Sequence, residues 1–171
     1  MRYYLVTIDP CEDRLPEVLD WNENVPISAF YQERTWEIKF RNLLNIKDTG
    51  WEPRYLKILL SPLPLVNESL LPVFELYGFH GIQKQMIFLD RKRSKAELYF
   101  LLQLKRIASK LEPSAGRMVM KCKSETIVDV NAFYVMDGRK CHLICSLPLV
   151  ESLILQGLVG VNFTNVEMEW R

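Results

Sequence analysis

The stretch SLPLVESLILQGLVGV, residues 146–161, decides how we interpret the fold. It repeats an earlier stretch, SPLPLVNESLLPVFELYGFHGI, at 61–82. Both begin with serine, contain Leu-Pro-Leu-Val followed by a Glu-Ser pair, and reach a Gly-x-x-Gly. Serine can cap a helix, proline suits a first turn, and glycine lets the chain turn back. Each copy therefore predicts a helix between two strands.

The first copy contains a further proline, Pro72, which would disrupt the interior of a helix that began at Ser61. We therefore expect that helix to restart near Asn67 or Ser69, with Pro72 in its first turn, and to end at Gly78. The helix of the second copy is expected to begin at Ser146.

Other runs rich in β-branched and aromatic residues predict strands, and Asp137-Gly138 predicts a two-residue hairpin turn. In RTWEIKF, residues 34–40, apolar and charged residues alternate with the period of a half-buried strand. Residues 11–31 are expected to form an irregular, mostly exposed connection. The other strand predictions cover 2–9, 55–61, 81–90, 117–123, 126–135, 139–145 and 159–170.

The segment 91–116 can be interpreted in two ways. Ser94 and Glu97 have the spacing of a capping box, which favours a helix that ends before Pro113. The run LYFLLQL, 98–104, would also serve as a buried strand. Whether 96–108 is helix or strand stays open at this point.

The whole pattern predicts an α+β fold with a mixed or mainly antiparallel sheet, a few helices and two similar strand–helix–strand units. A chain of 171 residues fits a single domain over 1–171, and lobes at 1–90 and 91–171 stay open. Apolar residues make up 49% and charged residues 25%, as in ordinary globular proteins. With no signal peptide or apolar run long enough to span a bilayer, we expect a cytoplasmic protein with reduced cysteines.

Charge is unevenly distributed along the chain. Residues 1–37 hold eight acidic and three basic residues, and residues 91–123 hold ten basic and two acidic residues. Acidic residues around an aromatic anchor can bind a basic protein surface. The residues expected to contact a protein partner are Asp9, Glu12, Asp13, Glu17, Asp20, Trp21 and Glu23.

The basic segment 91–123 supports an alternative function, a small nucleic-acid-binding regulator. Lys and Arg neutralise phosphates, and Tyr99 and Phe100 nearby could stack on bases. A solvated helix face explains the same residues, and the sequence contains no recognisable nucleic-acid module. The residues that would carry this function are Arg91, Lys92, Arg93, Lys95, Lys105 and Arg106.

Catalytic and metal-binding patterns are weak. A Cys–His nucleophile could be built from Cys122, Cys141 or Cys145 with His80 or His142, but buried cysteines on strands explain the same residues. In a strand, Cys141 and Cys145 share one face while His142 points away, so a four-ligand zinc site would need Cys11 or Cys122. We expect no catalytic residues, no metal and no cofactor.

Three stretches carry a resemblance to a known family: MRYYLV at 1–6, the run at 59–89, and CHLICSLPLVESLILQGLVGVNFTNVEMEW at 141–170. They resemble the immunity proteins of bacterial polymorphic-toxin systems, of the contact-dependent or type VI kind. The resemblance implies a non-enzymatic, cytoplasmic antitoxin that binds and blocks a cognate protein toxin.

The segment 98–116 departs from this family. The family commonly has Asp and Ser after its central tyrosine-containing strand, whereas this segment has Ser114 and no Asp. The resemblance also favours a strand for 98–104, and it transfers no catalytic residue to this chain. Membrane binding is not expected, and the sequence leaves the toxin and the oligomeric state open.

Overall fold

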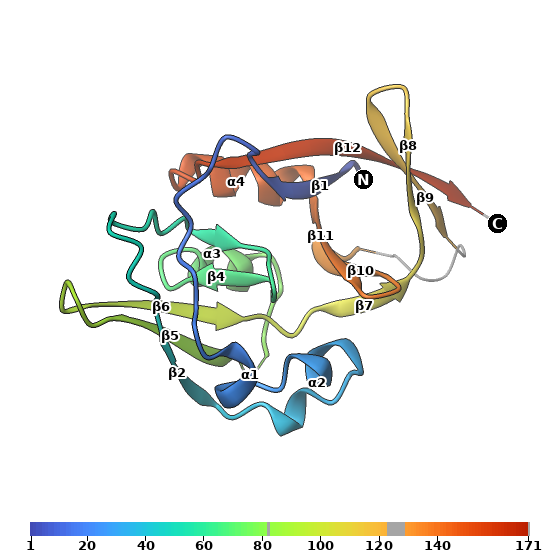
Figure 1. Cartoon of the computed structure of the whole chain (residues 1–171). Coiled ribbons are helices and arrows are strands. Elements are labelled where there is room, and N and C mark those ends of the chain that lie inside the picture. The colour runs from blue at the N-terminus through green and yellow to red at the C-terminus, as the bar shows by residue number, and fades with distance from the viewer. Residues whose placement is uncertain (82, 123–128, 171) are drawn as a thin grey trace. The chain divides into compact units, whose positions relative to one another are not determined.

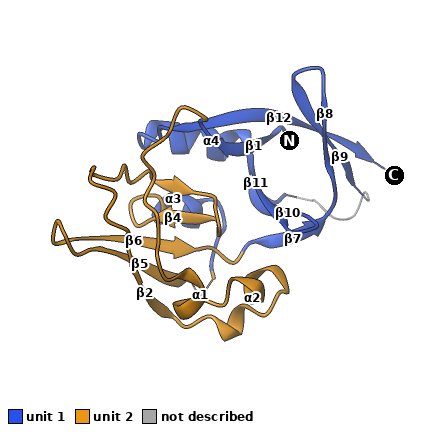
Figure 2. Cartoon of the chain, viewed as in Figure 1, with its two compact units in different colours: residues 1–9, 72–80, 104–171 blue, residues 10–71, 81–103 orange. Residues whose placement is uncertain are grey.

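The computed structural model describes residues 1–81, 83–122 and 129–170 (Figure 1). They adopt the α+β fold with mixed sheets that the sequence predicts. The chain forms two compact units, which interleave along the sequence (Figure 2). Unit 1 comprises 1–9, 72–80 and 104–171, and unit 2 comprises 10–71 and 81–103. The single domain over 1–171 and the lobes 1–90 and 91–171 stay predictions.

Unit 1 contains a seven-stranded sheet among its described residues, in the order β7-β10-β11-β1-β12-β9-β8. One face of this sheet forms an apolar core that includes Leu5, Phe133, Ile144 and Val166. The strands and the helix α4 are β1 (Tyr3–Ile8), β7 (Lys105–Ala108), β8 (Leu111–Ser114), β9 (Arg117–Cys122), β10 (Ala132–Asp137), β11 (Lys140–Ser146), α4 (Leu147–Leu155) and β12 (Val161–Trp170).

Unit 2 contains a five-stranded sheet among its described residues, in the order β2-β5-β6-β4-β3. Phe88 lies on its buried face, between Trp21 of α1 and Tyr99 of β6. The elements are α1 (Trp21–Asn24), α2 (Ile27–Tyr31), a 3₁₀ turn (Thr35–Glu37), β2 (Arg41–Asn45), β3 (Ile58–Leu59), β4 (Leu65–Asn67), β5 (Lys84–Asp90) and β6 (Lys95–Leu101). The helix α3 (Leu71–Leu76) begins in unit 2 and continues in unit 1.

The two sheets share a five-strand arrangement. In unit 2, β4 and β5 flank β6 and run antiparallel to it, while β2 pairs in parallel with β5 and β3 pairs antiparallel with β4. In unit 1, β11 and β12 flank β1 in the same way, while β9 pairs in parallel with β12 and β10 pairs antiparallel with β11. Because β6 follows β5 directly whereas β1 begins the chain, the two arrangements are related by circular permutation.

The repeated sequence occupies equivalent places in these arrangements, but in a shifted register. The Leu-Pro-Leu-Val of the second copy forms the first turn of α4, whereas that of the first copy, 63–66, runs into β4. The stretch equivalent to the start of α4 begins at Leu71. Proline is the second residue of both helices, and a glycine follows two residues after each helix ends.

The helix ends match in detail. Gly78 and Gly157 have φ values of 91° and 76°, which glycine adopts without strain. The backbone N–H of Phe79 donates to Phe74 O, and that of Leu158 donates to Leu153 O, each at 3.1 Å. Both bonds are the 6→1 bond of a Schellman motif. The glycine turns are therefore structural, as the sequence predicts.

Several predicted elements are confirmed. The strand at the N-terminus and the final strand form as expected. The predicted hairpin also forms, but its two turn residues are Gly138 and Arg139, because Asp137 pairs with Lys140. The first-copy helix does restart late and ends before Gly78, while Ser61 precedes β4 and begins no helix. Residues 82 and 123–128 lie outside the described residues. The predicted strand 81–90 includes residue 82, and the predicted strands 117–123 and 126–135 include part of 123–128. Of 55–61, only Ile58–Leu59 is strand.

The structure decides between the two interpretations of 91–116 in favour of strands, and the helix that the capping box favoured does not form. This segment forms β6, β7 and β8 instead, and β6 pairs with β5 over seven residue pairs from Lys84↔Leu101 to Asp90↔Lys95. The capping-box spacing describes only one helical turn, whereas pairing with β5 satisfies the backbone over the whole strand. Ser94 lies in the β5–β6 turn with φ 51°.

The strand predicted at 34–40 is also wrong. Residues 35–37 form a 3₁₀ turn, and β2 begins only at Arg41. Of the three apolar residues expected to face the core, Ile38 is buried, while Trp36 and Phe40 are 73% and 53% exposed. The connection 11–31 is less irregular than expected, because it contains α1 and α2. Among the described residues, none of the helices is long and apolar enough to cross a bilayer.

Candidate functional site

The predicted acidic segment lies along β2, the edge strand of the unit 2 sheet. Val18 forms an isolated antiparallel bridge with Ile46. The N–H of Leu19 donates to Asn45 O at 2.9 Å, and the N–H of Lys47 donates to Glu17 O at 2.8 Å. These bonds fix residues 17–19 beside the C-terminal end of β2, so the acidic side chains that follow are held at the edge of the sheet.

Asp20 anchors this segment. Its carboxylate accepts hydrogen bonds from the backbone N–H of Asn45 at 2.9 Å and from Asn45 Nδ2 at 2.8 Å. Asn45 Oδ1 in turn accepts a hydrogen bond from Arg91 Nε at 2.8 Å. A chain of polar contacts therefore connects the acidic segment through β2 to the turn between β5 and β6.

Around this chain lies an open hollow of about 510 Å³. Four acidic and two basic residues line it, together with Leu19, whose residue surface is 64% exposed. An exposed leucine among carboxylates suits contact with a protein that offers an apolar anchor and basic side chains. The lining residues are Leu19, Asp20, Glu23, Asn45, Ile46, Asp48, Asp90, Arg91 and Lys92. We call this the β2 hollow.

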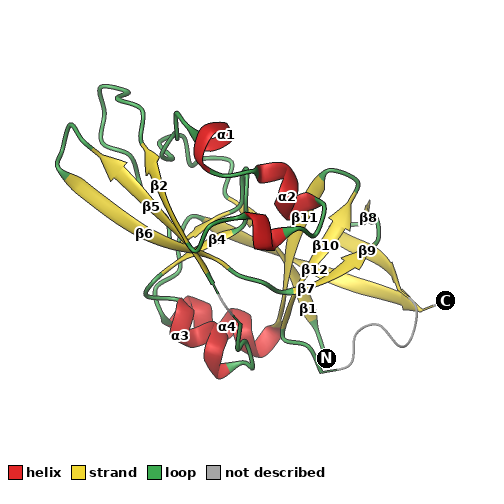
Figure 3. Cartoon of the chain, turned by 90° about the horizontal axis from the view of Figure 1, so that it is seen from below, coloured by secondary structure: helices red, strands yellow, loops and turns green. Residues whose placement is uncertain are grey.

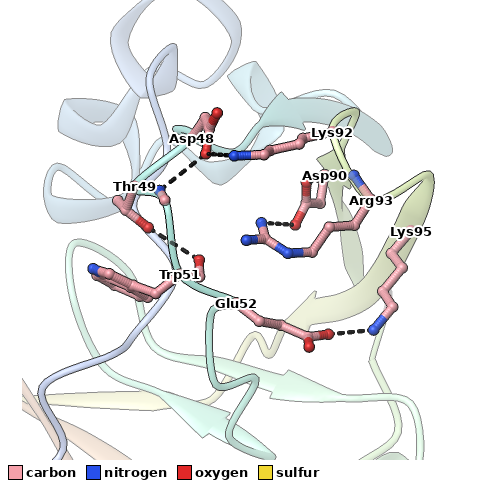
Figure 4. A network of polar contacts seen from close by, with 9 residues as sticks. Asp48, Thr49, Trp51, Glu52, Asp90, Lys92, Arg93 and Lys95 are labelled. Atoms are coloured by element: carbon pink, nitrogen blue, oxygen red, sulfur yellow. Dashed lines mark hydrogen bonds and ion pairs between the residues drawn. The ribbon is translucent and has the colours of Figure 1, made fainter.

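Ion pairs connect the loop 48–52 to the β5–β6 turn (Figure 4). Lys92 Nζ contacts Asp48 Oδ1 at 2.9 Å, and Lys95 pairs with Glu52. Within the turn itself, Arg93 Nη1 contacts Asp90 Oδ2 at 3.0 Å. Hydrogen bonds from Lys92 and the Gly50 N–H lower the pKa of Asp48.

Glu52 responds to its partner in the same way, because the hydrogen bond from Lys95 lowers the pKa of its carboxyl. Both carboxylates therefore stay ionised near neutral pH. They are fixed negative charges rather than proton-transfer groups.

The structure brings only some of the predicted partner-binding residues together. Asp20 and Glu23 line the β2 hollow, and Glu17 pairs with Lys47 at its edge at 3.2 Å. Trp21 packs edge-on against Phe88 with ring centroids 6.0 Å apart, so it supports the fold rather than standing free as an anchor.

The remaining predicted residues lie elsewhere. Glu12 pairs with Arg54 at 2.6 Å, with only 10% of its side chain exposed, and Asp13 is exposed. Asp9 belongs to unit 1, where its backbone N–H donates to Gly160 O at 2.9 Å.

The basic segment proposed for nucleic-acid binding is divided. Arg91, Lys92, Arg93 and Lys95 lie at the β5–β6 turn of unit 2, where each contacts a carboxylate or Asn45. Lys105 and Arg106 lie on β7 of unit 1. In unit 2, therefore, the acidic and basic charges that are separate in the sequence meet in space.

The cysteines and histidines considered for catalysis lie on or near strands. Burial raises the pKa of Cys141 to about 12 and also raises the pKa values of Cys122 and Cys145. Burial lowers the pKa of His142, which lies next to Cys141 on β11 and points to the opposite face. A thiolate–imidazolium pair is disfavoured at these positions.

Within residues 1–81, 83–122 and 129–170, no group of three or more His, Cys, Asp or Glu side chains is placed to hold a metal ion. The prediction of a non-enzymatic protein without cofactors stays a prediction.

Sequence reasoning missed several residues of the β2 hollow, above all Leu19 and Asn45. One signal was available for Leu19, because it stands between acidic residues in EVLDWNE without a helical or strand period to bury it. No signal was available for Asn45, since its role depends on three segments that are far apart in the sequence.

No family model matches this sequence, and no curated protein matches it.

Proposed function

We propose that this protein is a non-enzymatic bacterial immunity protein, which acts in the cytoplasm by binding and blocking a cognate protein toxin. The main support for this proposal is the β2 hollow, where an exposed leucine lies among acidic side chains that hydrogen bonds hold in place. Such a surface offers an apolar contact surrounded by charge, which is the arrangement of a protein interface.

Two further observations support a binding role. The carboxylates of Asp48 and Asp90 are occupied by Lys92 and Arg93, which leaves the hollow pre-organised for contact rather than for proton transfer. The contacts that neutralise the β5–β6 turn also reduce its capacity to bind phosphates, which weakens the case for the nucleic-acid regulator.

The test is complex formation with the protein encoded next to this gene. We expect the two purified proteins to elute together in size-exclusion chromatography and co-expression to protect cells from the toxin. The double variant Leu19→Asp/Glu23→Lys should weaken the complex at least about tenfold, equivalent to ~1.4 kcal/mol, in titration calorimetry.

Glu68→Lys is the matched control for the Glu23→Lys component, because it makes that charge change at an exposed residue outside the hollow. It should leave the affinity unchanged. The proposal is wrong if no neighbouring gene product binds, and the assignment to the β2 hollow is wrong if the double variant binds as tightly as the wild type.

A further inference from the structure

A second surface, on unit 1, carries exposed apolar side chains on α3 and α4. The helices contact each other through Tyr77, whose hydroxyl donates to Pro148 O at 2.9 Å and lies 2.7 Å from Ser152 Oγ (Figure 3). Beside this contact, Leu76 and Leu155 are 79% and 84% exposed. Ile154 and Val159 are also more than half exposed. We call these four residues the α3–α4 leucine surface.

The leucines occupy equivalent positions in the internal repeat. Each is the last residue of its helix and stands two residues before the glycine with positive φ. The same helices bury Val73, Phe74 and Leu153 toward the protein. Apolar residues therefore occupy both the buried face and the solvent-facing side of these helices. A surface helix that faces only solvent carries polar residues on its outer side.

The two helices and the turns that follow them contain acidic residues and no Lys or Arg. Residues 58–83 and 141–170 contain no Lys or Arg. On α4, Glu151 lies three and four residues before Ile154 and Leu155, on the same side of the helix. On α3, Glu75 supplies a second exposed carboxylate in the last turn, although it does not share the side of Leu76. The leucine surface is therefore bordered by acidic side chains.

We propose that the α3–α4 leucine surface binds a basic amphipathic segment of another protein. Apolar side chains of that segment would cover the leucines, while its Lys or Arg would face Glu75 and Glu151. A second copy of this chain fits less well, because a two-fold contact would bring the same glutamates together. An anionic membrane would be repelled by the same charges. This inference does not rest on the proposed function.

The test uses two synthetic amphipathic peptides with leucines at helical spacing, one with lysines and one with glutamates on the polar face. We expect the lysine peptide to bind the full-length protein in fluorescence anisotropy and the glutamate peptide not to bind. Leu76→Ser/Leu155→Ser should raise the Kd of the lysine peptide at least about tenfold. Leu43→Ser, which alters an exposed leucine of unit 2 outside the β2 hollow, should leave that Kd unchanged.

A charge variant gives a second, independent measurement. Glu75→Gln/Glu151→Gln should weaken the lysine peptide and reduce the salt dependence of its binding, while circular dichroism confirms that all variants are folded. Equal binding of both peptides, or unchanged binding by the leucine variant, would overturn the proposal. Two other results would also overturn it. One is that the wild type sediments as a dimer and Leu76→Ser/Leu155→Ser dissociates it. The other is that the wild type binds phosphatidylglycerol vesicles and this variant does not.

Discussion

Two tyrosines of unit 2 show how one hydroxyl can stabilise the fold and another can weaken it. The hydroxyl of Tyr99 donates to Leu56 O at 2.6 Å in the buried interior. The hydroxyl oxygen of Tyr55 is buried as well, but among the described residues it has no hydrogen-bond partner. A buried polar group without a partner costs free energy that a paired one does not.

We therefore expect opposite results from the same chemical change. Tyr99→Phe leaves a buried carbonyl unpaired and should lower the free energy of unfolding by about 1–3 kcal/mol. Tyr55→Phe removes an unpaired hydroxyl and should leave stability unchanged or raise it. Urea denaturation of both variants measures the difference, and equal destabilisation by the two would contradict this account.

Tyr55 also predicts a pH dependence. Burial, together with the negative charges of Asp90 and Glu97, raises its pKa from its ordinary value near 10 to about 12. Because the folded protein holds this proton more tightly than the unfolded chain, this group leaves stability independent of pH below pH 10 and lowers it as the pH rises toward 12. Tyr55→Phe should flatten this decline in urea titrations at pH 9–12, and an unchanged slope would argue against it.

The cysteines give a second test at the residue scale. Cys11 is exposed, whereas burial raises the pKa values of Cys122, Cys141 and Cys145. Since the thiolate is the reactive form, one thiol should react rapidly with DTNB at pH 8 in the folded protein. Cys11→Ser should remove that fast phase. A fast phase that survives this substitution would restore the catalytic Cys–His interpretation.

Among the elements, the β5–β6 turn separates two interpretations of the sequence. If Ser94 were a helix cap, Ser94→Gly would lose a capping hydroxyl and destabilise the protein slightly. In the structure Ser94 instead has φ 51°, a conformation that costs a non-glycine residue roughly 1 kcal/mol. Ser94→Gly should therefore raise the free energy of unfolding by about 0.5–1 kcal/mol in urea denaturation. Ser94→Ala is the control, because it removes the hydroxyl but keeps the Cβ.

The elements also show what the sequence could predict. The β10–β11 hairpin follows from Asp137-Gly138, and both glycine turns follow from Gly78 and Gly157, because each depends on local backbone preferences. The error at 34–40 has a tertiary cause. Its alternating pattern is real, but only Ile38 is buried, and β2 takes its place next to β5.

The candidate site was only partly predictable for the same reason. The acidic residues Asp20 and Glu23 could be selected from composition, and both line the β2 hollow. Their partners Asn45 and Arg91 could not, since each becomes relevant only after three separate segments have met.

At the scale of the whole molecule, the shared five-strand arrangement predicts a circular permutant. We expect a chain that starts at Pro10 and joins residue 171 to Met1 through a short glycine–serine linker to fold. In this order β1 follows β12, as β6 follows β5, and the pairing Tyr3↔Val166 places the start of β1 beside the second half of β12, within reach of a short linker. Its circular dichroism spectrum should match that of the wild type, and its free energy of unfolding in urea should lie within ~2 kcal/mol of the wild-type value.

A control permutant opened inside β5, at Phe88, should fail to fold because it divides a strand that pairs on both sides. Equal failure of both permutants would contradict the equivalence of the two arrangements.

The central place of β1 has a consequence for the protein's synthesis. Within this sequence β1 is translated before the other described strands, whereas its neighbours β11 and β12 are translated only after all strands of unit 2. All strands of unit 2 have been made by Leu101, so its sheet can assemble while the ribosome is still translating the rest of unit 1. Throughout that interval β1 keeps two unpaired edges, each able to pair with another nascent chain. Slow translation of 104–140 would lengthen that exposure and favour aggregation.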